Sequence, residues 1–193
     1  MAKRYGLVID LERCIGCQTC DIACRVENGM ETVSGMRVET VGGDYADTPA
    51  GTFPNLSMYF LPIACMHCDE PACLDACPTG AISKRPDGIV ILDKEKCDGC
   101  QACLDACMYE AMKYDEDANV VRKCNLCFER VDDGFEPFCA TCCGVNAIYC
   151  GDLNDPNSEV SKLIVSKNAY QLKQERGTGP AVYYCSTWEK RLV

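Results

Sequence analysis

Four cysteines lie within eleven residues near the start of the chain, in the stretch CIGCQTCDIAC from Cys14 to Cys24. The gaps between them are two, two and three residues, and the same gaps return in CDGCQACLDAC from Cys97 to Cys107. In paired iron–sulfur sites with this spacing, the first three thiolates bind one 4Fe-4S cluster and the fourth reaches a second one. The two stretches therefore predict 4Fe-4S clusters arranged in pairs.

Two further groups of four cysteines have the same chemistry with wider gaps. The gaps are two, four and three residues in the second group along the chain, and two, eleven and three in the fourth. With four thiolates to a cluster, the sixteen cysteines predict four 4Fe-4S clusters. Groups one to four are Cys14, Cys17, Cys20 and Cys24; Cys65, Cys68, Cys73 and Cys77; Cys97, Cys100, Cys103 and Cys107; and Cys124, Cys127, Cys139 and Cys143.

Three cysteines are surplus, and one of them gives an alternative for the last ligand. Cys142 stands beside Cys143 and would close group four on a gap of two residues. Cys143 is preferred because the other three groups all end on a gap of three. Free cysteine packs well as a small apolar residue, so Cys142, Cys150 and Cys185 are expected to be ordinary packing residues. His67, the one histidine, is interpreted as a polar contact beside its loop.

A disulfide scaffold and structural zinc are the competing interpretations of a chain with 19 cysteines in 193 residues. The odd total, the lack of a signal-peptide pattern and gaps too short for the Cα separation of a disulfide argue against cystines. Zinc takes its ligands as separated pairs, which would leave the third and fourth thiols of groups one and three without a role. Iron–sulfur clusters give a role to every cysteine of the four groups.

The formal net charge is −10, and the 19 Lys and Arg residues are scattered along the chain. This balance argues against binding to nucleic acid or an anionic membrane surface and favours docking to a specific protein. No apolar run reaches the roughly 18 to 20 residues of a membrane span, so we expect no direct membrane insertion. The segment Tyr5–Asp10 is expected to be a strand and not part of a signal peptide. The expected location is cytoplasmic, or exported with a partner that carries a twin-arginine leader.

The elements that position the cysteines repeat along the chain. Fifteen-residue stretches starting at Asp10 and Asp93 share nine identical positions, at an offset of 83 residues. The second stretch follows a predicted strand at Gly88–Leu92, and apolar residues flanking polar turns predict hairpins over residues 81–92 and 111–122. The sequence therefore predicts an α+β fold of two bacterial ferredoxin-like modules, each with two 4Fe-4S clusters.

The predicted modules are not contiguous in the chain. Residues 1–24 together with 108–150 are expected to form module one, which holds groups one and four. Residues 65–107 are expected to form module two, which holds groups two and three.

Two segments lie outside the predicted modules. Residues 25–64 are interpreted as an insertion with a hairpin, ending in a strand-like stretch at Leu56–Leu61. Residues 151–193 are expected to form an amphipathic helix, with Asp155 as its N-cap and Pro156 in its first turn. An extended tail, predicted to lie across the surface of the modules, follows the helix.

The order of these motifs resembles the four-cluster iron–sulfur subunit that accompanies molybdopterin or tungstopterin catalytic subunits of the DMSO reductase family. The similar phrases, which span nearly the whole chain, are VIDLERCIGCQTCDIAC, CMHCDEPACLDACPTGAI, CDGCQACLDAC, KCNLCFERVDDGFEPFC and GDLNDPNSEVS. The resemblance implies a subunit that relays single electrons and is not an enzyme on its own. It also implies a large molybdopterin- or tungstopterin-containing partner, and leaves open a membrane-anchor or quinone subunit.

The resemblance also implies which cysteines share a cluster. Some members of the family have tryptophan at the position of Cys100 and carry a 3Fe-4S centre there, so Cys100 favours four 4Fe-4S clusters. Met108 and Gly144 stand where proline is usual, and the phrase CATCCG is similar to that of transhydroxylase-type subunits. The implied sets are Cys14, Cys17, Cys20 and Cys143; Cys24, Cys124, Cys127 and Cys139; Cys65, Cys68, Cys73 and Cys107; and Cys77, Cys97, Cys100 and Cys103.

A freestanding polyferredoxin that carries electrons between soluble redox enzymes is the alternative function. It would need the same clusters and the same cysteines. The 40 residues of the insertion and the long C-terminal segment favour a fixed partner, because a small carrier needs neither.

Overall fold

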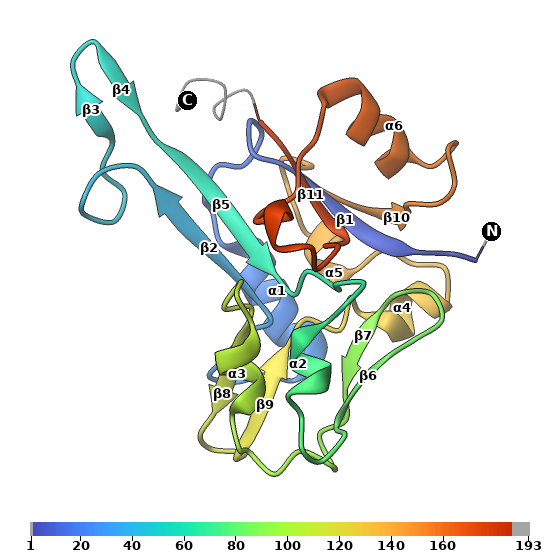
Figure 1. The fold of residues 1–193 in the computed structure, drawn as a ribbon. Coiled ribbons are helices and arrows are strands. Elements are labelled where there is room, and N and C mark those ends of the chain that lie inside the picture. Colours follow the sequence, from blue (N-terminus) through green and yellow to red (C-terminus); the bar gives the residue numbers. More distant parts are fainter. Residues whose placement is uncertain (1, 187–193) are drawn as a thin grey trace.

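The computed structural model describes residues 2–186 and has a mixed α+β fold, which confirms the predicted class. Short strands and short helices surround the cysteine loops, and a long ribbon of strands projects from the body (Figure 1). No helix in the described part of the chain is long and apolar enough to cross a membrane.

A three-stranded sheet is built around the N-terminal strand. Strand β1 (Tyr5–Asp10) pairs antiparallel with β10 (Ile148–Asp152) on one side and parallel with β11 (Val182–Cys185) on the other. Three successive β1 side chains, Leu7, Val8 and Ile9, are fully buried, because both faces of the strand are covered. The strand predicted at Tyr5–Asp10 is confirmed, and it brings the start of the chain against its end.

The C-terminal tail is part of the core, so the prediction that it lies across the surface is wrong. Ala181, Val182 and Tyr184 are fully buried, and the Tyr184 hydroxyl donates a hydrogen bond to the Pro62 carbonyl at 2.9 Å. The free edge of β1 explains the difference, since its backbone donors and acceptors need partners and β11 supplies them. Residues 187–193 of the predicted tail lie outside the described residues.

The predicted C-terminal helix is α6 (Glu159–Lys167), and it begins later than expected. Ser158, not Asp155, is its N-cap, with the Ser158 hydroxyl accepting the Ser161 N–H at 3.2 Å. The Asp155 carboxylate instead accepts the Asn157 N–H at 2.8 Å and closes a turn before the helix. Val160 is fully buried against the three-stranded sheet. A 3-10 turn, η1 (Gln174–Arg176), follows the helix.

The insertion forms a ribbon of two stacked hairpins. Strands β2 (Met36–Val41) and β5 (Tyr59–Ala64) pair antiparallel near the body, and β3 (Ala50–Thr52) and β4 (Asn55–Ser57) extend the ribbon outward (Figure 1). The strand-like stretch predicted from Leu56 is thus divided between β4 and β5. The Phe53 side chain at the tip is 85% exposed.

Both predicted cysteine-flanking hairpins are present. The first joins β6 (Ile82–Lys84) to β7 (Val90–Leu92), and the second joins β8 (Met112–Asp115) to β9 (Val120–Lys123). The two hairpins share a core, in which Ile82, Val90, Met112 and Val121 pack with Cys73 and Cys103. The short helices that carry or follow the cysteines are α1 (Thr19–Asn28), α2 (Ala72–Asp75), α3 (Ala102–Ala106), α4 (Phe128–Asp132) and α5 (Phe138–Thr141).

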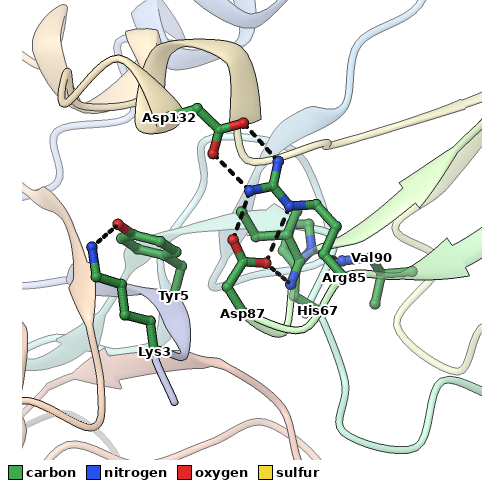
Figure 2. Close-up of polar contacts among 8 residues, drawn as sticks. Lys3, Tyr5, His67, Arg85, Asp87, Val90 and Asp132 are labelled. Atoms are coloured by element: carbon green, nitrogen blue, oxygen red, sulfur yellow. Dashed lines mark hydrogen bonds and ion pairs between the residues drawn. The ribbon is translucent and has the colours of Figure 1, made fainter. Parts of the chain in front are cut away.

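One arginine joins the β6–β7 hairpin to α4. The Arg85 guanidinium bonds both carboxylate oxygens of Asp132, at 2.6 and 2.9 Å, and both oxygens of Asp87, at 2.7 and 3.2 Å (Figure 2). Its hydrogen bond holds the pKa of Asp132 below the usual value for a carboxylic acid. Such forked pairs fix orientation as well as contributing energy, so Arg85 links two elements that lie 47 residues apart.

We expect Arg85→Met to loosen the β6–β7 hairpin. Partly exposed ion pairs stabilise a folded protein by up to about 1 kcal/mol. Loss of that stabilisation makes local opening of the hairpin, and hence exchange of its amide hydrogens, roughly fivefold faster. Amide hydrogen exchange of residues 82–84 and 90–92 measures this loss of protection.

Arg176→Met is the matched control. Arg176 is 68% exposed, and its ion pair is with the adjacent Glu175, at 4.0 Å. Its replacement should leave hairpin exchange unchanged, and an equal effect of both variants would contradict the linking role of Arg85.

Candidate iron–sulfur cluster sites

Each group begins with a C-x-x-C turn that contains a left-handed residue. The residue just before the second cysteine has a positive φ in all four: 68° at Gly16, 44° at His67, 76° at Gly99 and 57° at Leu126. A left-handed residue in such a turn makes successive backbone N–H groups face one side, which forms a concavity suited to anions and to Fe–S clusters. Glycine adopts this conformation freely in two of the turns, while the histidine and the leucine are held there by their burial.

Backbone donors also reach the sulfur atoms directly. The Leu126 N–H points at Cys124 Sγ at 3.3 Å, and the Ala147 N–H points at Cys143 Sγ at 3.2 Å. Hydrogen bonds of this kind favour the thiolate over the thiol, and the thiolate is the form that binds metal. The turns are therefore arranged to stabilise negative charge on sulfur.

Group one lies beside the end of group four. Burial, and then the charges of Cys14 and Cys143, raise the pKa of the Cys20 thiol to about 12. Burial also raises the pKa of Cys14, with further contributions from Cys143 and Cys17. The structure thus gathers Cys14, Cys17, Cys20 and Cys143 into one set, here called tetrad A. Cys142 is the C-cap of α5.

The remaining thiols of groups one and four form a second set, tetrad B, made of Cys24, Cys124, Cys127 and Cys139. Burial raises the pKa of Cys139 well above its usual value, and the charges of the other three add to this. All four residues are buried, with exposed fractions between 6% and 8%. Cys20 also acts on Cys139, so tetrads A and B are neighbours.

Groups two and three are interleaved in the same way. Burial, and then the charges of Cys65 and Cys107, raise the pKa of Cys73 to about 12, and the Cys68 charge adds to this. Burial also raises the pKa of Cys103 to about 11, with contributions from Cys77, Cys97 and Cys100. Tetrad C is Cys65, Cys68, Cys73 and Cys107, and tetrad D is Cys77, Cys97, Cys100 and Cys103.

The four tetrads differ in their access to solvent. Tetrads A and D each contain one exposed thiol, Cys17 and Cys100, whereas tetrad B is buried throughout. Burial, and then the charges of Cys24 and of Cys65 in tetrad C, raise the pKa of Cys124 in tetrad B, so these two tetrads also meet. Cys73 and Cys103 pack in one apolar cluster, which joins tetrad C to tetrad D. The thiols therefore form a row in the order A, B, C, D, with accessible sulfur at both ends.

The donor sets fit 4Fe-4S clusters better than single ions. In residues 2–186, no three His, Cys, Asp or Glu side chains converge closely enough to hold one metal ion. A 4Fe-4S cluster takes one thiolate at each of four irons, so its ligands stand apart by the width of the cluster. In each tetrad, burial and then the charges of the other three thiols raise the pKa of one thiol, which matches that arrangement.

Two of the surplus cysteines, Cys150 and Cys185, and His67 lie in packed parts of the protein. Cys185 is 1% exposed and packs with Val8 and Val160, while Cys150 is on β10, where burial raises its pKa to about 12. His67 is fully enclosed, and its Nδ1 accepts the Val90 N–H at 3.0 Å.

Lys123 is a residue of the site that sequence reasoning missed. It is 4% exposed and approaches Cys65 Sγ at 3.8 Å. The sequence pattern that could have revealed it is the alternation of side chains in strand β9. This alternation places Lys123 on the same buried face as Val121, directly before Cys124.

Comparison with known proteins is consistent with this chemistry. The family model described as a 4Fe-4S dicluster domain matches residues 56–153. A subunit of the sulfite dehydrogenase from Allochromatium vinosum is 39% identical, with 98% of this chain and 85% of the relative aligned. One chain of the Escherichia coli anaerobic dimethyl sulfoxide reductase is also 39% identical, over 80% of this chain and 77% of its own. The iron–sulfur subunit of a Shewanella arsenate respiratory reductase is 32% identical, over 94% and 95%.

The neighbouring cysteines of group four give a direct test of the ligand set. We expect Cys143→Ala to lower the iron content by about four atoms per chain, because tetrad A loses a ligand. Cys142→Ala is the matched control and should keep the full iron content. Iron and acid-labile sulfide analysis after anaerobic purification measures both, and the reverse pattern would assign the ligand to Cys142.

Proposed function

Because this protein belongs to the family of iron–sulfur subunits of DMSO reductase-type oxidoreductases, we propose that it relays single electrons through four 4Fe-4S clusters. The electrons pass to or from a catalytic subunit that contains molybdopterin or tungstopterin. The chain is an electron-transfer subunit and performs no bond chemistry itself. The observation that carries the proposal is the row of four thiol tetrads, with one exposed thiol in each of the two end tetrads.

The proposed ligands are the sixteen cysteines of tetrads A to D, each tetrad holding one cluster. The mutual effects of the thiols on one another's pKa support this assignment. Tetrads A and B draw only on groups one and four, and tetrads C and D only on groups two and three. This division supports two modules with two clusters each, in the manner of bacterial ferredoxins.

The boundary between the proposed modules passes through one hairpin. Residues 1–24 with 108–150 form module one, and residues 65–107 form module two. The β8–β9 hairpin lies within residues 108–150 and so belongs to module one. However, Met112 and Val121 of this hairpin pack with Cys73 and Cys103 of module two. The β8–β9 hairpin is therefore the element that the two modules share.

A bound 4Fe-4S cluster supplies reversible one-electron chemistry at a potential set by its surroundings. The chain's own residues hold and insulate that chemistry. The Leu126 N–H in the C-x-x-C turn of group four and the Ala147 N–H after its last cysteine point at sulfur atoms, which stabilises negative charge. Burial of tetrad B keeps water from the middle of the row, and the exposed Cys17 and Cys100 mark its two points of access.

A fixed catalytic partner is favoured over the freestanding polyferredoxin. The relatives are named as subunits or chains of reductases and a dehydrogenase, and such names describe parts of larger assemblies. A membrane-anchor or quinone subunit is compatible with the second exposed end of the row. The negative net charge of −10 makes nucleic acid a poor partner.

The cluster count is tested by the iron content of the whole chain. We expect roughly sixteen irons per chain after anaerobic purification, and a brown colour that dithionite bleaches. Cys185→Ser is the matched control, because Cys185 packs in the apolar cluster of Val8 and Val160 and belongs to no tetrad. Fewer than about twelve irons, after reconstitution with iron and sulfide, would contradict four clusters.

The partner is tested by recovering the tagged chain anaerobically from its native host. We expect a large pterin-containing subunit to copurify, because the relatives are subunits of reductase complexes. A tag on an unrelated protein of similar size is the control. Recovery of a brown, iron-loaded monomer without a partner would favour the polyferredoxin.

A further inference from the structure

A buried cation without a carboxylate partner lies at the centre of the row of tetrads. Lys123 is one of the few buried charged residues, at 4% exposed. Two others, Asp10 and Asp115, are paired with Lys167 at 2.6 Å and Arg122 at 2.9 Å. Among the ion pairs of residues 2–186, none involves Lys123. Buried charges are paired as a rule, so its counter-charge must come from another kind of group.

The partners of Lys123 suit a protonated amine. Its Nζ donates to the Cys124 carbonyl at 2.9 Å, to the Val90 carbonyl, and to Cys65 Sγ at 3.8 Å. An ammonium group has three donors and no acceptor, and here it meets three acceptors. The only one of the three that can carry a full negative charge is the sulfur of Cys65.

The position of Lys123 is the junction between the two halves of the row. Cys65 belongs to tetrad C, and Cys124, whose carbonyl Lys123 also binds, belongs to tetrad B. Burial and the Cys65 charge raise the pKa of Cys73, and the positive charge of Lys123 opposes them. One cation therefore contacts residues from the tetrads of both modules.

The adjacent histidine is bound to the same residue as Lys123. His67 is 1% exposed, so its ring is shielded from water. Its Nδ1 accepts the N–H of Val90 (Figure 2). The carbonyl of the same residue accepts a hydrogen bond from Lys123. The peptide groups of Val90 in β7 thus anchor both side chains at the junction.

We propose that Lys123 raises the reduction potential of the clusters in tetrads B and C, and so sets the step by which an electron crosses between the modules. When a cluster accepts one electron its negative charge rises by one. A fixed positive charge in a region shielded from water stabilises that added charge strongly. The acidic protein repels an added electron, and Lys123 opposes that repulsion in the most deeply buried part of the row. The inference rests on the proposed function, since it requires clusters in these tetrads.

Removal of the charge at nearly constant volume tests the role of Lys123. Lys123→Met and Lys123→Gln are compared in the full chain, purified anaerobically and reconstituted with iron and sulfide. Glutamine keeps N–H donors for the two carbonyls, so it separates lost charge from lost hydrogen bonds. Lys113→Met is the matched control, because Lys113 is an exposed lysine on the adjoining strand β8. Iron content and a dithionite potentiometric titration followed by EPR are measured for each.

In both neutral variants we expect unchanged iron content and, for at least one cluster, a tenfold lower ratio of reduced to oxidised form at fixed solution potential. For a one-electron couple this is a shift of about 59 mV to lower potential. Lys113→Met should leave every potential unchanged. Unchanged potentials in both Lys123 variants, or an equal shift in Lys113→Met, would overturn the inference. Loss of iron from both neutral variants would also overturn it, by making Lys123 structural; a wild-type chain without clusters would instead refute the proposed function.

Discussion

Sixteen thiols that repel one another as thiolates converge in a small protein, fourteen of them buried or half-buried, and the rest of the structure follows from that constraint. Burial and neighbouring charges raise the pKa of many of these thiols, so bringing them together opposes their ionisation. Bound iron reverses this effect, because the metal takes the thiolate and supplies positive charge. Many of the same cysteines also lie within the apolar core, so the residues that would bind iron–sulfur clusters also fill the interior of the protein.

The constraint also explains where polar groups are tolerated inside the protein. Backbone N–H groups face sulfur in the turns that hold the tetrads, which stabilises charge without adding a titratable side chain. The one buried ammonium among the described residues lies where the two modules meet and touches a sulfur of tetrad C. The ends of the row, by contrast, rely on solvent, since Cys17 and Cys100 are exposed. Solvation is thus graded along the path proposed for the electron.

Local features of the fold could be predicted from the sequence, and features made by distant contacts could not. The gaps within each group indicated the cluster loops, and polar turns between apolar runs indicated both cysteine-flanking hairpins, because spacing and turn chemistry are local. Spacing alone did not determine that Cys143 meets Cys20, since that requires the fold to close; family resemblance supplied it. The burial of β11 was missed because a strand edge elsewhere in the chain creates it. The role of Lys123 was missed because a lysine is normally exposed.

The parallel pairing of β1 with β11 has a consequence for biosynthesis. The strand that leads into group one cannot gain its second neighbour until translation has passed Cys185, close to the end of the chain. Tetrad A likewise waits for Cys143, whereas tetrads C and D need nothing beyond Cys107. The sites proposed for tetrads C and D therefore have all their cysteines before those proposed for tetrads A and B, so the first cysteines of the chain are among the last to complete a site.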